Sequence, residues 1–338
     1  MNVAVKPRLR AASDATQTFA DDVMAGLMAE PKRLPPKYFY DQRGSRLFEE
    51  ITQLPEYYPT RTETAILQAN APEIAKLIPA DAAMVEFGAG SGAKARILLR
   101  AASQTSANRV SAYVPVDISG EFLSNEAARL REDMPKLRVL PVAADFTRPF
   151  QLPADLGAKP RVGFFPGSTI GNFEPHEAHA FLRHAAALLG RGAVLIIGVD
   201  LVKDPAILNA AYNDAAGVTA AFNLNLLERI NRELDGAFKL EKFCHRAFYN
   251  REKRRVEMHL VSLARQKVRV MGKLVEFRRG ETIHTENSYK YTVELFRSQA
   301  RSAGWTPAAF WLDEQNYFSV HALVASAPVK AVRSGAGV

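Results

Sequence analysis

The chain contains 338 residues, of which 47% are hydrophobic and 24% are charged. Its 44 Lys and Arg residues exceed its 36 Asp and Glu residues, which gives a net charge of +8 with neutral histidines. This composition is typical of a soluble globular protein with one large domain or two ordinary ones. We expect no membrane partner, because the sequence has no run of 18 apolar residues that could span a bilayer.

The basic residues are scattered along the sequence rather than gathered in a stripe or interleaved with aromatic residues. We therefore expect no nucleic-acid partner. Cys244 is the single cysteine, which excludes an intramolecular disulfide and a multi-cysteine metal site. Residues 1–20 lack the apolar stretch of a secretory signal. Together these features lead us to expect a cytoplasmic protein, which we take to be a monomer that binds no metal.

The N-terminal part begins with a predicted helical arm over 15–28, followed by proline-rich and aromatic loops over 32–60. Strand and helix signals then alternate from 84 to 201, which indicates a parallel sheet with helices on both faces. The first strand ends at Phe87, and a helix follows over 93–102. Further strands are predicted at 113–117, 139–146, 161–166 and 193–200.

A long insertion follows the last of these strands. Residues 205–234 are predicted to be helical with a break at Gly217, and 238–279 to form antiparallel strands. After Tyr289 the earlier pattern resumes, with a helix over 292–303 and strands at 308–312 and 318–326. The chain is therefore predicted to form two discontinuous domains. Their bounds are 61–200 with 289–328, and 15–60 with 201–288, flanked by disordered tails at 1–14 and 329–338.

A glycine-rich turn connects the first strand to its helix, in Glu86-Phe87-Gly88-Ala89-Gly90-Ser91-Gly92. Glycines allow a ligand to approach the backbone, and a helix N-terminus offers free N–H groups. The spacing E-x-G-x-G-x-G differs from the dinucleotide fingerprint G-x-G-x-x-G. It resembles the first motif of class I S-adenosylmethionine (SAM) methyltransferases. An ordinary strand–helix turn, or a site for another nucleotide, remains the alternative.

Two further strands end in aspartates. Asp117 ends the second strand, where an acid can accept hydrogen bonds from both ribose hydroxyls. Asp145 and Phe146 end the third strand. In the SAM enzymes that the motif resembles, the acid at this place accepts from the adenine amine, and the next backbone N–H serves a ring nitrogen. Each acid alone could be a helix cap or a surface carboxylate, but three such features in the right order indicate a cofactor site.

A second set of polar and aromatic residues lies outside these strand ends. Asn172 follows the fourth strand, where ligands bind in open α/β sheets. It could instead cap a helix that begins near Pro175. Tyr57 could be a core aromatic, and Glu286 a surface acid paired with Lys290 four residues later.

At nearly full length, the sequence resembles the L-histidine Nα-methyltransferases of the ergothioneine pathway. The resemblance rests on long motifs at 54–63, 168–172, 212–222 and 281–290. It implies an α/β fold: the doubly wound, Rossmann-like sheet of class I SAM methyltransferases with a second α+β substrate domain. The implied reaction transfers methyl groups successively from SAM to L-histidine, giving S-adenosylhomocysteine and the trimethyl betaine hercynine.

The resemblance also assigns site residues. Asn172 and Tyr212 are expected to hold the amino-acid carboxylate, and Tyr57 to lie near the amine. Glu286 and Ser288 are expected to grip the imidazole. Met258 matches a wall of the pocket. The expected cofactor-binding positions are Gly88, Gly90, Lys94, Asp117, Asp145 and Phe146.

Methyl transfer from a sulfonium mainly requires that the nucleophile be positioned and unprotonated. We therefore expect catalytic roles for Tyr57 and Tyr40: a tyrosine hydroxyl could hold the amine and relay its proton, and aromatic faces could stabilise the quaternary product. Glu286 would supply specificity, because a buried carboxylate without an imidazole N–H partner is costly. The alternatives are a methyltransferase for another amino acid, such as tryptophan, and a non-catalytic sensor of SAM or amino acids.

Overall fold

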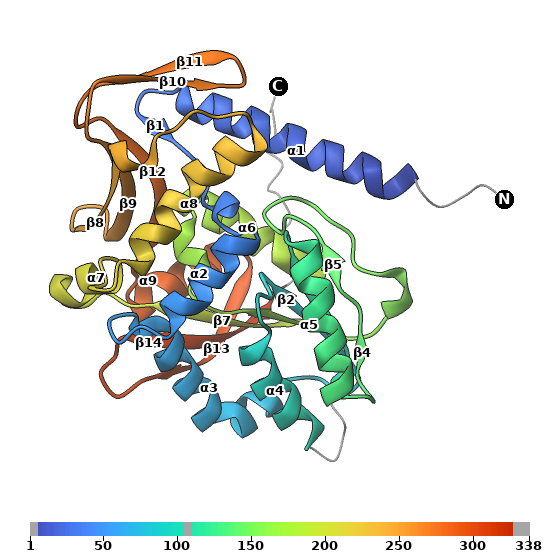
Figure 1. Ribbon diagram of the computed structural model, residues 1–338. Helices are drawn as coiled ribbons and strands as arrows, with labels where there is room; N and C mark the ends of the chain where they lie inside the picture. Colours follow the sequence, from blue (N-terminus) through green and yellow to red (C-terminus); the bar gives the residue numbers. More distant parts are fainter. Residues whose placement is uncertain (1–5, 105–109, 327–338) are drawn as a thin grey trace, which may run out of the picture. The chain divides into compact units, whose positions relative to one another are not determined.

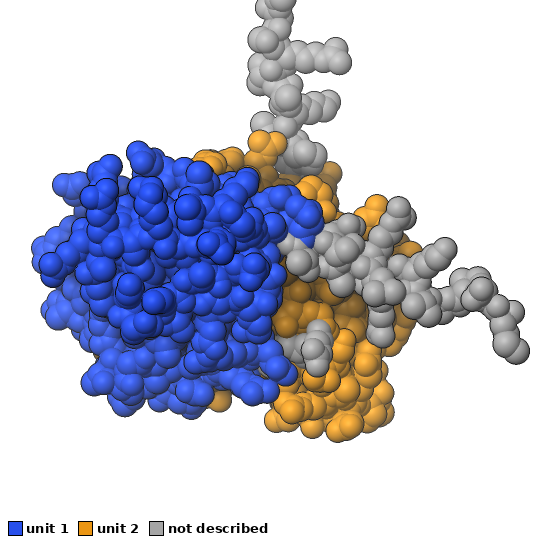
Figure 2. Space-filling model, turned by 45° about the horizontal axis from the view of Figure 1, so that its top comes forward, with its two compact units in different colours: residues 1–58, 203–289 blue, residues 59–202, 290–338 orange. Residues whose placement is uncertain are grey.

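The computed structural model describes residues 6–104 and 110–326. The chain forms two compact units, each built from separated segments (Figure 2). Unit 1 comprises residues 1–58 and 203–289, and unit 2 comprises 59–202 and 290–338. The assignment of one unit to the substrate and the other to the cofactor stays a prediction. None of the helices in the described ranges is long and apolar enough to cross a membrane.

Unit 2 contains an eight-stranded sheet in the described part of the chain, with the path β13-β14-β7-β6-β2-β3-β4 and β5 paired to β3 (Figure 1). The pairings are parallel except for those of β14, which runs antiparallel to both β7 and β13. This arrangement confirms the predicted doubly wound sheet. The strands are β2 (Ala82–Phe87), β3 (Val110–Asp117), β4 (Arg138–Val139), β5 (Val142–Ala143), β6 (Arg161–Phe165), β7 (Val194–Asp200), β13 (Trp305–Leu312) and β14 (Phe318–Ala325).

Helices cover both faces of this sheet. On one face, α3 (Tyr58–Lys76), α4 (Ala93–Ser103) and α5 (Gly120–Asp133) bury apolar side chains against the strands, including Phe164 of β6. The neighbouring Phe165 points the other way and packs 4.5 Å, between ring centroids, from Phe181 of α6 (Pro175–Leu189). Next to α6 lies α9 (Val293–Ser302). Strands buried on both faces explain the continuous apolar runs seen in the sequence.

The third predicted strand is wrong in detail. Residues 139–146 do not form one strand, because β4 and β5 are separate two-residue pieces. Pro141 lies between them, and proline has no N–H to donate to a sheet. Asp145 therefore follows in a turn beyond β5 rather than on the strand itself.

Unit 1 contains a four-stranded sheet with the order β1-β12-β9-β8, within the described residues. Its strands are β1 (Lys32–Arg33), β8 (Phe243–Asn250), β9 (Arg255–Ser262) and β12 (Thr282–Tyr289). A separate hairpin joins β10 (Gln266–Val270) to β11 (Lys273–Phe277). The helices α7 (Pro205–Ala211) and α8 (Val218–Glu233) flank Gly217, whose φ of 73° suits the predicted break.

The N-terminal segment of unit 1 is more helical than predicted. Helix α1 (Lys6–Leu27) begins before position 15, so part of the predicted tail is helical, whereas 1–5 and 329–338 lie outside the described residues. The predicted loop region contains α2 (Gln42–Thr52). Asp41 caps this helix, because its carboxylate accepts a hydrogen bond from the Gly44 N–H at 2.7 Å.

Candidate active site

The glycine-rich turn is shaped by backbone conformations that favour glycine. Gly88, Gly90 and Gly92 have φ values of 71°, 48° and 63°, in the left-handed region. A Cβ on Gly88 would lie 3.3 Å from Cε1 of Phe146. The turn thus approaches the segment after Asp145 closely, as expected if both contact one ligand.

Glu86, at the end of β2, is buried beneath this turn. Its carboxyl group accepts a hydrogen bond from the hydroxyl of Tyr113 on the neighbouring strand. Burial raises the pKa of Glu86 to about 8, although Tyr113 and the Lys94 ammonium act in the opposite direction. Glu86 is therefore mainly protonated at neutral pH.

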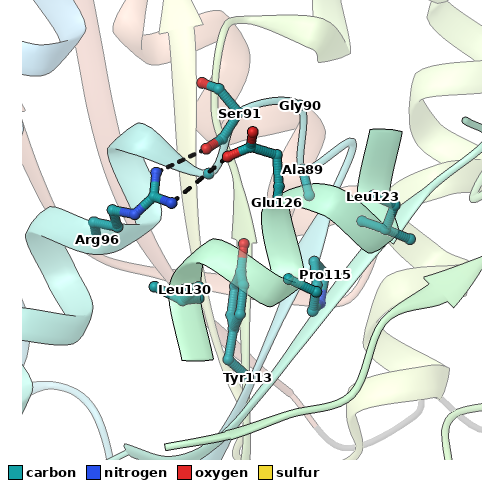
Figure 3. A pocket seen from close by; sticks show the side chains of 11 residues that line it. Ala89, Gly90, Ser91, Arg96, Tyr113, Pro115, Leu123, Glu126 and Leu130 are labelled. Atoms are coloured by element: carbon teal, nitrogen blue, oxygen red, sulfur yellow. Dashed lines mark hydrogen bonds and ion pairs between the residues drawn. The ribbon is translucent and has the colours of Figure 1, made fainter. Parts of the chain in front are cut away.

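A small cavity lies beside the same turn, and Tyr113 projects into it (Figure 3). Arg96 of α4 donates to the backbone oxygen of Ser91 at 3.0 Å and lies 3.6 Å from a carboxylate oxygen of Glu126 on α5. These contacts tie the turn to the helices on either side. The conformation of the turn is therefore fixed by its contacts with both helices.

Asp117 is already oriented by backbone donors. One oxygen accepts from the Gly90 N–H at 3.2 Å, and the other accepts from the Ser119 N–H at 3.0 Å. The Ile118 backbone also contributes a hydrogen bond. A carboxylate has about four acceptor positions, so Asp117 retains acceptor capacity for a further donor. This geometry fits the predicted role toward a ribose. Burial raises the pKa of Asp117, and a cationic ligand nearby would favour its ionised form.

Asp145 is held by a local turn. Its Oδ1 accepts from the backbone N–H and the hydroxyl of Thr147, at 3.0 and 2.5 Å. Phe146 packs its ring against Phe87 and Phe165. The carboxylate and the following backbone N–H are thus fixed next to Gly88, where the predicted adenine contacts would form.

Lys94 and Glu63 form an ion pair that the sequence did not predict. Glu63 of α3 is fully buried, and its two oxygens also lie 3.0 and 2.8 Å from the Gly167 nitrogen. The pair therefore connects the start of α4 to the loop after β6. In this arrangement the Lys94 charge is balanced by Glu63, so Lys94 can position the cofactor loop as well as contact a ligand.

Asn172 lies at the end of the short 3-10 helix Thr169–Asn172, in the loop after β6. It does not cap α6. The cap is Glu174, whose backbone N–H donates to the Glu177 side chain at 2.9 Å in a capping box. The capping alternative for Asn172 is thus wrong, while its proposed role toward a carboxylate stays a prediction.

Three of the predicted substrate residues, together with the predicted catalytic residue Tyr40, form one contiguous group in unit 1. The hydroxyl of Tyr212 donates to Ser288 Oγ at 2.7 Å, in a buried hydrogen bond. The Tyr212 ring lies 6.3 Å from that of Tyr57, centroid to centroid. Tyr57 and Tyr40 both contact the ring of Phe48, at 6.2 and 5.6 Å. Within unit 1, the residues predicted for the carboxylate (Tyr212), the amine (Tyr57) and the imidazole (Ser288) therefore adjoin one another.

Glu286 and Met258 face each other across the pair β12–β9. Residues four apart on a strand are separated by about 13 Å, so the helical i, i+4 pairing of Glu286 with Lys290 does not apply. Lys290 instead forms a buried ion pair with Asp200, with 2.7 Å between Nζ and Oδ2. Glu286 and Ser288 lie two residues apart on β12, so both can point to the same side of the sheet, as predicted.

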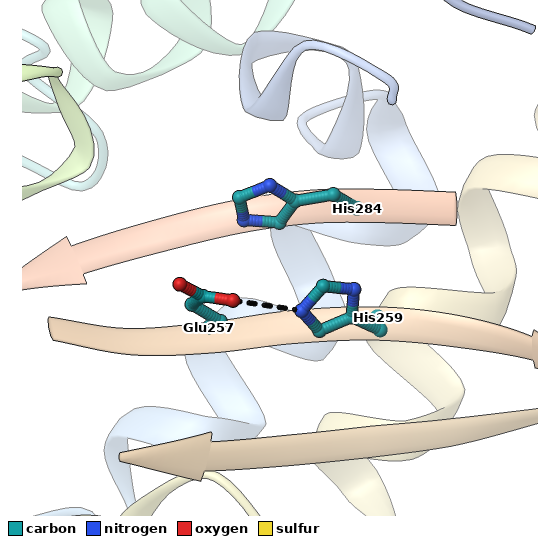
Figure 4. Close-up of side chains that lie close together, drawn as sticks. All are labelled: Glu257, His259 and His284. Carbon is teal, nitrogen blue, oxygen red and sulfur yellow. Dashed lines mark hydrogen bonds and ion pairs between the residues drawn. The ribbon is translucent and has the colours of Figure 1, made fainter. Parts of the chain in front are cut away.

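A polar cluster that the sequence analysis missed lies on the opposite face of this sheet. Glu257, His259 and His284 have potential ligand atoms within 4.8 Å of one another (Figure 4). However, Arg255 already pairs with Glu257 at 2.8 Å, and the two imidazoles stack at 4.7 Å with an 18° angle between them. Stacked rings aim their in-plane lone pairs side by side rather than at one ion. The arrangement favours a packed ion pair over a metal site.

Glu63, Asn223 and Thr285 are the other polar residues near the site that sequence analysis missed. All three are buried, with at most 1% of any of them exposed. Polar side chains that are so deeply buried require hydrogen-bond partners. Asn223 had a signal in the sequence, as a polar residue within an apolar segment, whereas Glu63 and Thr285 lie among polar residues and had none.

A doubly wound sheet, a glycine-rich turn after β2, and aspartates at the end of β3 and after β5 are the arrangement expected of a class I SAM-dependent methyltransferase. Residues 19–325 match the family model described as histidine-specific methyltransferase, SAM-dependent, and the chain belongs to this family. The protein is therefore an enzyme of the methyltransferase class.

Curated relatives agree with this family. The chain is 41% identical to a histidine N-alpha-methyltransferase of Mycolicibacterium smegmatis, over 92% of this chain and 96% of the relative. It is 40% identical to the enzyme of the same name from Mycobacterium tuberculosis, over 88% and 92%. It is also 32% identical to ergothioneine biosynthesis protein 1 of Neurospora crassa, over 88% of this chain and 33% of that longer protein.

Proposed function

We propose that this enzyme methylates the α-amine of L-histidine three times in succession, with SAM as methyl donor, and so makes hercynine for ergothioneine biosynthesis. The family and the names of the relatives support this reaction. The observation that carries the proposal is the hydrogen bond from Tyr212 to Ser288. Tyr212 is proposed to bind the carboxylate and Ser288 to bind the imidazole. A ligand the size of histidine carries both groups, so the residues that bind them must lie close together, as this hydrogen bond requires.

The residues of the glycine-rich turn suit a phosphate-free, cationic cofactor. Asp117 would bind the ribose hydroxyls with its remaining acceptor positions, and Asp145 and the Phe146 N–H would bind the adenine. Gly88 and Gly90 keep the backbone accessible, while Lys94 supports the turn through Glu63. When bound, SAM supplies an electrophilic methyl group on a sulfonium.

The amino-acid residues position the nucleophile. Asn172 and Tyr212 would hold the carboxylate, while Glu286 and Ser288 would fix the imidazole against Met258. The α-amine must lose a proton before each transfer, because an ammonium has no lone pair. Tyr57 would hold the amine and pass its proton to solvent. The faces of Tyr57 and Tyr40 would stabilise the growing positive charge by cation–π contact. None of these steps uses a metal ion.

An incubation with isotopically labelled SAM and a panel of amino acids tests the proposal directly. We expect mono-, di- and trimethylated histidine, detected by mass, with hercynine as the final product. Preferred methylation of tryptophan would contradict the histidine assignment and favour the alternative substrate. Cofactor binding without methylation of any amino acid would favour a sensor. The cytoplasmic location and the monomeric state stay predictions, and gel filtration with light scattering checks the latter.

A further inference from the structure

A chain of hydrogen bonds connects the two parts of unit 1 that carry the proposed substrate residues. Tyr212, which ends α7, lies at one end. Thr285, next to Glu286 on β12, lies at the other. His245 of β8 and Asn223 of α8 lie between them. None of the roles assigned above uses His245, Asn223 or Thr285.

Each polar atom of this connection has a defined role. His245 Nε2 lies 2.8 Å from the backbone oxygen of Tyr212, and its Nδ1 lies 2.9 Å from Asn223 Nδ2. A carbonyl oxygen can only accept, so Nε2 carries the proton and Nδ1 accepts from the amide. Asn223 Nδ2 also donates to the His259 carbonyl at 3.1 Å, and its Oδ1 accepts from the Thr285 hydroxyl at 2.8 Å. The Met258 carbonyl oxygen, 3.1 Å from the same hydroxyl, is its second and longer acceptor contact. The Asn223 amide thus uses both its donor and acceptor sides.

The surroundings favour this pattern. Asn223 is fully buried and Thr285 is 1% exposed, so neither can replace a lost partner with bulk water. Burial lowers the pKa of His245, although the Tyr212 carbonyl and the Asp214 charge act in the opposite direction. The neutral imidazole that the hydrogen bonds require is therefore the favoured form at neutral pH.

Thr285 is also the extra residue of a β-bulge. His284 pairs with His259, and Glu286 pairs with Met258, so Thr285 has no register partner on β9, although its hydroxyl lies 3.1 Å from the Met258 carbonyl oxygen. In an unbroken strand, residues two apart share a face. Here His284 lies on the face of His259 and Glu286 on the face of Met258. The bulge therefore turns Glu286 and Ser288 away from the histidine face, as bulges next to active sites commonly do.

We propose that His245, Asn223 and Thr285 are positioning residues for amino-acid recognition. Asn223 fixes the bulge at Thr285, which presents Glu286 and Ser288, and through His245 it fixes the backbone of Tyr212. One buried amide thereby sets the spacing between the imidazole contacts and the carboxylate contact. This inference rests on the proposed histidine methylation, because it assigns the network to that substrate site.

Thr285→Val tests the network, since valine has nearly the same shape but no hydroxyl. We expect the histidine concentration for half-maximal rate to rise about tenfold, because a tenfold change corresponds to the free energy of one buried hydrogen bond. The preference for histidine over phenylalanine should fall by a similar factor, with a smaller change in kcat. The dissociation constant of S-adenosylhomocysteine, measured by calorimetry, should stay within about twofold because the network lies in unit 1.

Two matched variants separate positioning from general damage. Thr285→Ser keeps the hydroxyl and should restore parent behaviour. Thr282→Val makes the same chemical change on the same strand, outside the network, and should also resemble the parent. Parent-like KM and preference in Thr285→Val would overturn the proposal, as would an equal loss in Thr285→Val and Thr285→Ser.

A double-mutant cycle of His245 and Thr285 tests the connection through Asn223, and His245→Gln alone tests it if Thr285→Val folds poorly. His245→Gln breaks the network from its other end and should raise the histidine KM in the same direction. Combined with Thr285→Ser, which keeps the hydroxyl, its effect should equal that of His245→Gln alone. Combined with Thr285→Val, its effect should be non-additive, because both changes act on one amide. Additive effects, or a His245→Gln enzyme with an unchanged KM, would overturn the connection.

The parent enzyme is first tested on the amino-acid panel, so that the two proposals can fail separately. If the parent prefers another amino acid, histidine specificity is wrong, and the variants are compared on that amino acid. Altered KM confined to the network variants would then still support positioning. If the parent methylates none, amino-acid binding by calorimetry with S-adenosylhomocysteine present replaces KM, and binding that is absent, or equal in parent and variants, overturns the network.

Discussion

The two units build their candidate sites in different ways. In unit 2 the proposed cofactor contacts come from backbone conformations and strand ends, such as the positive φ of Gly90 and its N–H bond to Asp117. In unit 1 the proposed substrate contacts depend on side chains far apart in the sequence, such as Tyr212 and Ser288, 76 residues apart. A backbone site can keep its form while side chains vary, whereas a side-chain site can change specificity through single substitutions.

The sharpest test of the backbone-built site concerns Glu86. Its pKa is about 8 in the folded chain against an ordinary 4.5, so the folded state keeps a proton that the unfolded state releases. Protonated Glu86 therefore stabilises the folded chain fully below about pH 4.5, and this stabilisation is lost as the pH rises through about 8. Between pH 5 and pH 8 we expect a loss of about 3 kcal/mol in unfolding free energy. Glu86→Gln should abolish that loss, as measured by urea unfolding at both pH values.

Glu257→Gln provides the control from unit 1. Glu257 is also buried, but hydrogen bonding and charge from Arg255, with His259, hold its pKa below the ordinary value. Its contribution to stability therefore has the opposite sign, and this variant should keep the loss at high pH. Parallel pH profiles for the parent and Glu86→Gln would show that Glu86 is not protonated in the folded chain.

The next effect concerns specificity in unit 1. Glu286→Ala should lower the preference for histidine over phenylalanine by about 100-fold, since a charge-assisted hydrogen bond contributes up to about 3 kcal/mol. Adding Met258→Val should enlarge the wall and admit tryptophan. A competition assay over the three amino acids, read by mass, measures both changes. Glu281→Ala, which removes an acid that pairs with Lys32 instead, is the control; an unchanged preference in Glu286→Ala would remove Glu286 from the site.

A cofactor-side substitution should leave the amino-acid site intact. Asp117→Ala should weaken SAM and S-adenosylhomocysteine by about 1–3 kcal/mol, because buried polar groups lose a partner. Calorimetry measures this change directly. Asp155→Ala removes an exposed aspartate from the same unit and should have no effect. Equal affinities for the parent and Asp117→Ala would refute the ribose assignment.

The smallest effect concerns the proposed carboxylate contacts. Asn172→Ala and Tyr212→Phe should each raise the histidine concentration for half-maximal rate about fivefold, near 1 kcal/mol for one hydrogen bond. SAM affinity should remain nearly unchanged. Steady-state kinetics with histidine at saturating SAM gives the result. Parent-like values for both variants would place the carboxylate elsewhere.

The sequence predicted those features that local patterns determine. Alternating strands and helices identified the sheet of unit 2, and the spacing of Gly88 and Gly90 identified its ligand-facing turn. Helix α2 was missed because its start depends on the Asp41 cap within a proline-rich segment. The proline at 141 also divided a strand that looked continuous.

The substrate site could be predicted only through the family resemblance. Nothing local to Tyr212 indicates that its hydroxyl reaches Ser288. The bulge at Thr285 depends on the register with β9 and has no signature in β12 alone. Asn223 looked like an ordinary polar residue of a helix until its partners were known. Long-range contacts of this kind follow from tertiary packing rather than from local periodicity.

The discontinuous strand order has a consequence for how the protein is made. Strand β1 pairs with β12, and the Lys32 ammonium reaches Glu281, 249 residues later in the chain. In unit 2, β14 lies between β7 and β13, so that sheet also waits for the final strand. On the ribosome, neither sheet can close until almost the whole chain has emerged. Pairings of such long range form slowly, and unpaired strand edges in the nascent chain are prone to aggregation. We therefore expect the yield of active enzyme to depend on chaperone supply and on the rate of translation.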